Sequence, residues 1–286
     1  SDLEPGMLYA PQMPFVWGHV FGGYKKRGDD GANLGYRSRV GGVIGGYEKP
    51  IDDHSIGVFG GASLAGMKTD EASVESDSNG FFVGGYGEYV VGDWAIDGAL
   101  VVGYQRHQDK RLVVDNLTGE ETAQSDYNSV YISPSLAVIR SIDIGSGIEL
   151  RPSAEVNYTY GYYGEYTETG TTSSNLRVKG HGVDVINGRL QLAARQALAD
   201  GRGEMELRGG MKYSYFGRDS VDVGLGNGPV LRYQGTGDTS SYGGYVGGNM
   251  RYDVDRRMTV VADMELGLAT GDERTASGYL GLEYRF

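Results

Sequence analysis

The chain has no cysteine among its 286 residues, and its four histidines are scattered. Without cysteine, a disulfide-stapled fold, a thiolate zinc site and a cysteine nucleophile are excluded. His19, His54, His107 and His181 also lack the HExxH spacing of zinc proteases. We therefore predict that the protein holds no metal and no cofactor.

Positive charge is scarce too, because 26 Lys and Arg stand against 38 Asp and Glu and give a net charge of −12. Surfaces that bind nucleic acid are basic, so we expect no nucleic-acid partner. No stretch approaches the ~18 consecutive apolar residues of a transmembrane helix. A membrane β-barrel is still possible, because its strands need an apolar residue only at every second position.

Glycine and tyrosine are abundant, with 49 and 22 residues, and glycine often occurs in pairs. The pairs lack the Gly-X-Y repeat of collagen. Glycine weakens a strand unless curvature or close approach requires it. Pairs such as Gly45-Gly46 and Gly84-Gly85 therefore predict a strongly curved sheet whose interior is kept free of side chains.

Apolar and polar residues alternate along most of the chain. In segment 203–216, Met205 and Leu207 fall on one side while Glu206 and Arg208 fall on the other. A strand sorts such residues onto two faces, whereas a helix would spread both sets around its circumference. About twelve segments show this pattern, at 15–25, 34–48, 54–68, 79–91, 93–108, 124–142, 147–163, 179–197, 203–217, 240–253, 256–269 and 275–286.

The lengths and connections of these segments favour a membrane barrel. Strands of globular proteins have a mode of about 5–6 residues, whereas a tilted strand needs about 9–11 to cross a bilayer. Short connections such as 50–53 alternate with longer polar ones such as 109–123 and 218–239. We predict an all-β fold, a transmembrane up-and-down antiparallel barrel of about 12 strands, with both chain ends on the periplasmic side.

Charged residues on the polar faces predict an aqueous interior. A charge facing lipid costs roughly 2–4 kcal/mol at the membrane midplane, whereas a lumen that holds water accepts it. These residues could hydrogen-bond a linker or helix and keep the conduit wet, or only pair with one another across neighbouring strands. The predicted pore-lining residues are Arg37, Arg39, Glu88, Glu149, Arg151, Glu155, Arg208, Lys212, Arg251 and Glu265.

Tyrosines gather near one predicted strand end. Tyr158, Tyr160, Tyr162, Tyr163 and Tyr166 lie within nine residues of one another. Tyrosine favours the membrane–water interface because its ring is apolar and its hydroxyl is polar. We interpret the cluster as part of an aromatic girdle.

Motifs along the whole chain resemble those of one family, the C-terminal β-domain of classical monomeric autotransporters (type V secretion). The family's first strand contains a Trp-Gly pair, which Trp17-Gly18 matches. The matching segment of this chain resembles that strand and reads Phe15-Val-Trp-Gly-His-Val-Phe-Gly-Gly-Tyr24. The further motifs, in order over about 270 residues, are Gly42-Val-Ile-Gly-Gly-Tyr47, Ile56-Gly-Val-Phe-Gly-Gly61, Gly103-Tyr104 followed by Lys110-Arg111, Leu150-Arg-Pro152, Tyr166-Thr-Glu-Thr-Gly170 and Leu280-Gly-Leu-Glu-Tyr-Arg-Phe286.

The resemblance implies an outer-membrane translocator that supports secretion of an N-terminal passenger domain to the cell surface. The implied barrel has a narrow hydrophilic pore spanned by an α-helix that precedes the first strand. Its implied partners are outer-membrane lipid, the barrel-assembly machinery, and its own passenger and linker helix, and we expect a monomer in the Gram-negative outer membrane. We expect residues 15–286 to form the barrel.

Residues 1–14 depart from the family pattern. Pro5, Gly6, Pro11 and Pro14 prevent a helix long enough to span the pore. We interpret this segment as a linker remnant that leads into the pore. The helix and the passenger are then expected upstream of Ser1, or to have been removed.

The last strand carries a pattern of its own. Leu280, Leu282, Tyr284 and Phe286 alternate with other residues and end on an aromatic carboxy-terminus. This resembles the signal by which the assembly machinery recognises outer-membrane barrels.

Two other functions stay open at this point. An outer-membrane enzyme, an omptin-like protease or a lipid-modifying enzyme, could hold its active site on the rim, where His181 and Asp184 could form an acid–base pair. A passive porin would need a loop that folds inward as a constriction, and no loop is obviously suited to that. We predict that the protein is not an enzyme.

Overall fold

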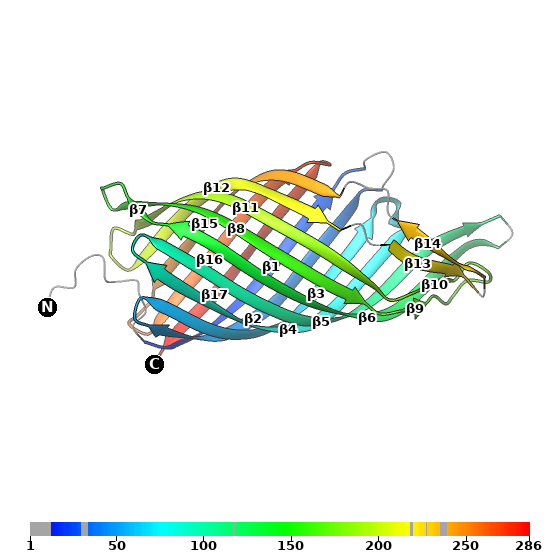
Figure 1. Cartoon of the computed structure of the whole chain (residues 1–286), viewed down its shortest axis with the longest axis horizontal. Helices are drawn as coiled ribbons and strands as arrows, with labels where there is room; N and C mark the ends of the chain where they lie inside the picture. The colour runs from blue at the N-terminus through cyan, green and yellow to red at the C-terminus, as the bar shows by residue number, and fades with distance from the viewer. Residues whose placement is uncertain (1–12, 30–33, 117, 218–219, 227, 235–238) are drawn as a thin grey trace.

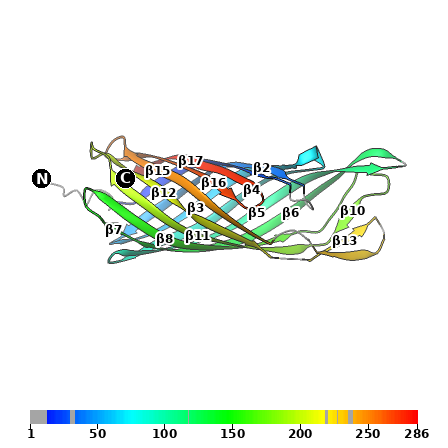
Figure 2. The same ribbon diagram turned by 90° about the horizontal axis from the view of Figure 1, so that it is seen from above.

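The alternating segments form strands that close into one barrel of twelve antiparallel strands. The computed structural model describes residues 13–29, 34–116, 118–217, 220–226, 228–234 and 239–286. The first strand, β1 (Phe15–Arg27), pairs with the last, β17 (Glu273–Arg285), with Phe15 opposite Arg285. The strands are strongly tilted and wind around an elongated barrel (Figures 1 and 2). The predicted fold is confirmed.

The other barrel strands follow the predicted segments within a few residues at most ends. They are β2 (Tyr36–Ile51), β3 (His54–Thr69), β4 (Val74–Val91), β5 (Trp94–Asp115), β6 (Gly119–Arg140), β8 (Ile148–Tyr163), β11 (His181–Ala197), β12 (Gly203–Phe216), β15 (Ser240–Asp253) and β16 (Met258–Ala269). The main difference is the predicted loop 109–123, most of which continues β5 and β6 as a long hairpin.

A second, four-stranded sheet lies at one end of the barrel, in the segments predicted as loops 164–178 and 218–239. Its strands are β9 (Tyr166–Thr167), β10 (Leu176–Val178), β13 (Ser220–Leu225) and β14 (Val230–Gln234). It lies at the end away from the start of β1 and the end of β17 (Figure 1). The remaining elements are short, β7 (Ile142–Asp143) and a 3-10 turn at Asp70–Ala72.

Among the described residues, no helix is long and apolar enough to cross a membrane.

The connections at the end where β1 begins are tight. Gly92, between β4 and β5, adopts a φ of 58°, and Asp52, between β2 and β3, adopts a φ of 53°. Two-residue hairpin turns need such positive φ values because their twist then matches that of the strands.

The barrel is apolar outside and polar inside. Val20, Leu64, Leu190 and Leu268 are exposed by 63 to 69% on the outer face. The polar faces make contacts that skip strands, such as the ion pair from Arg208 on β12 to Asp263 on β16, which passes over β15. Side chains of strands that are not neighbours converge only on the concave side, so these contacts identify the interior.

Inward-facing glycines receive aromatic rings from neighbouring strands. A Cβ atom on Gly46 would lie 2.6 Å from Cζ2 of Trp17, and one on Gly57 would overlap the ring of Tyr86. The space predicted to stay free is therefore filled at these positions. The glycines let large rings lie flat against a tightly curved wall.

Candidate functional site

The inner wall holds most of the charged residues that the sequence predicted there. The strand register fixes their side, since alternate residues share a face and opposed residues share it too. Glu155 on β8, Arg189 on β11 and Lys212 on β12 are successive opposed residues in one row. The predicted residues on this face are Glu88, Glu149, Arg151, Glu155, Arg208, Lys212, Arg251 and Glu265.

Arg37 and Arg39 lie on the outer face, so the prediction that they line the interior is wrong. They oppose Lys26 and Tyr24 of β1, and all four side chains alternate with the inward residues of their strands. Both arginines lie near the beginning of β2, outside the part of its outer face that is apolar. The cost of an outward charge falls to about 0–1 kcal/mol near the interface, so charge is no guide to the inner face there.

One side of the interior is ionic. We call the inner faces of β8, β11, β12, β15, β16 and β17 the ionic half. A chain of ion pairs crosses it, with N–O distances between 2.7 and 4.0 Å. Its members in order are Glu283, Arg251, Glu204, Arg195, Glu149, Arg151 and Glu206.

A second network lies beside this chain. Arg208 pairs with both oxygens of Asp263, at 2.6 and 2.9 Å, and with Glu265 at 3.4 Å. Glu265 also accepts from Arg189 at 2.6 Å, and the Arg189 guanidinium lies 4.3 Å from the centroid of the Tyr245 ring. Each carboxylate of the two networks thus has a cationic partner, so these networks are polar yet close to electrically neutral.

Several members of these networks were absent from the predicted set. They are Arg189, Arg195, Glu204, Glu206, Asp263 and Glu283. The alternation in the sequence does place each of them on the polar face of its strand, although the pore-lining prediction did not include them. Which residue pairs with which could not be read from the sequence, because several pairs join strands that are not neighbours.

The other side of the interior is largely aromatic. Trp17 of β1 donates its indole N–H to the hydroxyl of Tyr86 on β4 at 2.9 Å, and that hydroxyl donates to Glu48 at 2.6 Å. The ring centroid of Phe59 lies 6.4 Å from that of Trp17 and 6.4 Å from that of Phe82. We call this cluster, on β1 to β4, the aromatic half.

Polar hollows open in the interior between the two halves. One, of about 410 Å³, is lined by Glu48, Glu88, Asp97 and Glu155 among others. The next, of about 150 Å³, reaches Arg151 and shares Asp97 and Glu155 with the first. Carboxylates dominate the first hollow, so the interior keeps polar space beyond what the ion pairs fill.

The loop after β8 is fixed to the β5–β6 hairpin. Arg111 binds Glu168 through two hydrogen bonds of 3.0 and 2.6 Å, and Glu168 also accepts from the backbone N–H of Leu176 at 2.8 Å. Burial and the nearby carboxylates of Asp109 and Glu168 raise the pKa of the Tyr166 hydroxyl to about 12. Two motifs of the predicted family resemblance, Lys110-Arg111 and Tyr166 to Gly170, therefore meet in space.

The acid–base pair considered for a rim enzyme does not form. His181 opposes Tyr163 on the inner side and stacks on its ring, with centroids 5.5 Å apart. Asp184 lies on the outer face and accepts from the hydroxyl of Tyr158. Among the described residues, no three His, Asp or Glu side chains gather as metal ligands would.

The predicted aromatic girdle is only partly on the outside. Tyr158, Tyr160 and Tyr162 are 38, 38 and 45% exposed on the outer face. Tyr163 faces inward, beside His107 and His181, and Tyr166 stacks on the inward ring of Tyr127 at 4.5 Å. The interpretation is therefore wrong for these two residues, because Tyr163 occupies the alternate position and Tyr166 belongs to β9.

The carboxy-terminal residues lie on the outer face of the closing strand. Leu280, Leu282, Tyr284 and Phe286 are exposed by 61, 52, 44 and 59%. Their alternation places the four side chains in one row that faces away from the interior. The row is apolar, as a surface in contact with lipid requires.

A closed antiparallel barrel with an apolar outer face and a charged interior is an outer-membrane β-barrel. The family model "Autotransporter beta-domain" matches residues 16–265. The chain belongs to this family. It is a translocator barrel of the Gram-negative outer membrane, and passenger secretion is the role of the family.

Solved structures agree on the fold. The translocator domain of the autotransporter NalP from Neisseria meningitidis is 14% identical, with a TM-score of 0.73 over 98% of this chain and 91% of that one. The β-domain of the Bordetella autotransporter BrkA is 20% identical, with a TM-score of 0.68 over 96% and 100%. The transport unit of AIDA-I from Escherichia coli is 14% identical, with a TM-score of 0.58 over 100% and 93%. Among curated proteins, none matches this sequence.

Proposed function

We propose that the passenger segment crosses the membrane inside this barrel and along the ionic half. The observation that supports this is the pairing of charges there, from Arg208 with Asp263 to Arg251 with Glu283. A polar wall of both signs offers hydrogen bonds to a passing backbone. Because the charges of the two networks already pair with one another, they would not hold the segment strongly.

The lengths of the connections support the proposed orientation of the barrel. Tight turns lie at the end where β1 begins and β17 ends, and the small sheet lies at the other end (Figure 1). Outer-membrane barrels have short periplasmic turns and longer external loops. We therefore assign both barrel termini to the periplasmic side and the small sheet to the cell surface.

The amino-terminal segment is the proposed link to the passenger. Residues 1–12 of the predicted linker remnant lie outside the described residues, and Met13 and Pro14 precede β1 at the periplasmic end. A linker or helix placed there would enter the pore beside Trp17 and Glu48. Residues 15–286 would then form the translocator unit.

The proposed partners are lipid, the assembly machinery and the chain's own passenger. The outward row of Leu280, Leu282, Tyr284 and Phe286 is the proposed recognition signal for assembly. The pairing of β1 with β17 leaves the barrel sheet without a free edge, which removes one route to self-association and favours a monomer. We assign no catalysis to the barrel itself.

The absence of native cysteine allows a direct test of the route. Gln191 faces inward and accepts a hydrogen bond of 3.0 Å from Tyr245, whereas the adjacent Leu190 faces lipid and is 63% exposed. During secretion, Gln191→Cys should form a disulfide with a cysteine placed in the passenger linker. The matched Leu190→Cys should not, and cross-linking of both variants or of neither would contradict passage through the interior.

A further inference from the structure

The outer face of β1 to β4 changes from apolar to charged along one row. Val20, Val43, Ala62 and Phe81 oppose one another in sequence and form an apolar row. Farther toward the end of the small sheet, the outward residues become basic. We call these four cations the basic collar: Lys26, Arg37, Arg39 and Lys68.

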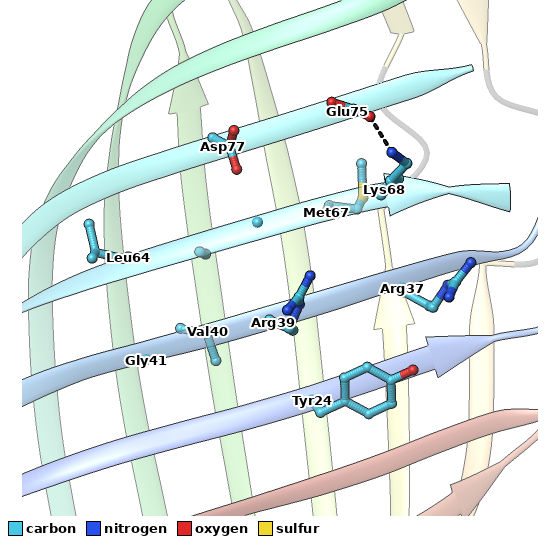
Figure 3. A pocket seen from close by; sticks show the side chains of 12 residues that line it. Tyr24, Arg37, Arg39, Val40, Gly41, Leu64, Met67, Lys68, Glu75 and Asp77 are labelled. Atoms are coloured by element: carbon cyan, nitrogen blue, oxygen red, sulfur yellow. Dashed lines mark hydrogen bonds and ion pairs between the residues drawn. The ribbon is translucent and has the colours of Figure 1, made fainter. Parts of the chain in front are cut away.

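The basic collar borders an open groove of about 870 Å³ on the outside of the barrel. Figure 3 shows its lining on neighbouring strands, with Arg37 and Arg39 on one strand and Lys68 and Glu75 paired on the next two. Leu64, 69% exposed, supplies its apolar end, and Tyr24 lies at its edge. The groove thus combines an apolar end with a cationic end.

The groove is lined by three cations, Arg37, Arg39 and Lys68, and by two carboxylates, Glu75 and Asp77, so its lining carries one net positive charge. Lys68 pairs with Glu75, and Arg37 lies 3.5 Å from Asp70 with a side chain that is 58% exposed. Arg39 forms no ion pair within the described residues. Side chains at positions i and i+2 of a strand lie on one face about 7 Å apart, so both guanidinium groups can reach one anionic group.

The collar is confined to one side of the barrel. The outer faces of β8, β11, β12 and β15, which the structure describes completely, carry no Lys or Arg, since all their basic residues face inward. Tyrosines such as Tyr160, Tyr213 and Tyr242 occupy the outer face there instead. A general preference for interfacial lysine or arginine would not produce this asymmetry, which indicates a localised anionic partner.

We propose that the basic collar binds the phosphorylated headgroup of a glycolipid in the outer leaflet, with an acyl chain lying against Leu64 and the apolar row below. This rests on the proposed orientation, which puts the collar at the cell-surface end. At that level of a membrane protein, the anions within reach of an outward side chain are lipid headgroups. Arginine suits phosphate because its planar guanidinium donates two parallel hydrogen bonds.

The test compares lipid binding by two double variants in detergent solution. Arg37→Gln with Arg39→Gln removes the two collar arginines. The control, Arg106→Gln with Arg232→Gln, removes two exposed arginines that already pair with Asp126 at 2.8 Å and Asp222 at 3.0 Å. Both variants change the net charge equally. The probes are purified bisphosphorylated lipid A and the same lipid without its phosphates, measured by native mass spectrometry.

A basic residue near an anionic membrane surface contributes about 1 kcal/mol, so the collar variant should bind phosphorylated lipid A roughly 10- to 30-fold more weakly. The affinity of the control variant for phosphorylated lipid A should change by less than about threefold. The collar variant and the unaltered barrel should bind the dephosphorylated lipid equally well. Equal binding by the collar variant, equal loss in the control, or displacement by inorganic phosphate at headgroup concentration would each overturn the proposal.

Separate measurements distinguish this proposal from the function on which it rests. The collar variant should retain heat-modifiable gel mobility and should display its passenger normally, because the two arginines face away from the interior. A protease site beside Gly119, at the tip of the β5–β6 hairpin, should be cut from outside intact cells. If the site is protected while lipid A still binds, the orientation fails and the outer-leaflet assignment is overturned with it.

Discussion

At the residue scale, the interior is built from two kinds of complementary contact. In the aromatic half, a ring from one strand covers a glycine on the next, as Trp17 covers Gly46. In the ionic half, guanidinium groups bind carboxylates on nearby strands, as Arg208 binds Asp263. Both contacts depend on the strong curvature that brings side chains together on the concave face.

A side chain at Gly46 should destabilise the barrel. The Cβ of Gly46→Leu would lie 2.6 Å from both the Trp17 ring and the Val58 carbonyl oxygen, and overpacking costs typically about 1–3 kcal/mol. The matched Gly45→Leu faces lipid, where the nearest atom lies 3.3 Å away. Urea unfolding in lipid vesicles should separate the two variants, and an equal midpoint for both would contradict the ring-over-glycine account.

Breaking the Arg208–Asp263 pair should cost more than breaking a surface pair. Their side chains are only 11 and 13% exposed, and removal of one partner of a buried pair costs about 3–5 kcal/mol. For the exposed Arg106–Asp126 pair, at 54 and 49%, the cost should be much smaller, because water screens the two charges. Arg208→Met and Arg106→Met would be compared by the same unfolding assay, and a larger loss at Arg106 would refute the assignment of faces.

At the element scale, alternation alone located the barrel strands. The period of two is present in strands such as β12, where Met205 and Leu207 face lipid and Glu206 faces inward. Arg37 and Arg39 were misplaced because they lie beyond the apolar part of β2, where lipid no longer penalises charge. The strands β9, β10, β13 and β14 were missed because segments of 2 to 6 residues are too short to display a period.

The loop that carries β9 and β10 should depend on Glu168. This carboxylate is 7% exposed and bonds both Arg111 and the backbone of Leu176. Glu168→Gln would weaken three charge-assisted hydrogen bonds, so the 164–178 segment should be cleaved several-fold faster by added protease while the barrel stays heat-modifiable. The exposed Glu165→Gln, whose partner is Lys179 at 3.1 Å, serves as the control and should leave the cleavage rate unchanged.

The closing strand should be indispensable. Deletion of residues 280–286 removes the partners of Phe15 to Val20 on β1 and of Met258 to Ala262 on β16. Unpaired backbone groups within a bilayer cost several kcal/mol each, so stable insertion should be lost. Heat-modifiable gel mobility would be measured after refolding into vesicles without any assembly machinery. This assay tests closure of the barrel separately from its recognition by that machinery. Phe286→Ala keeps the pairing and should still fold in that assay.

At the scale of the whole molecule, an aqueous interior requires that the apolar face of each strand meets lipid and the charged face meets water. Spin labels on single cysteines along β12 would measure this directly in bilayers, because the native chain has no cysteine. Labels at 205, 207 and 211 should be accessible to oxygen dissolved in lipid, and labels at 204, 206 and 212 to a water-soluble nickel reagent. Accessibility without a period of two, or with the two sets exchanged, would contradict the lipid-facing exterior and the aqueous interior.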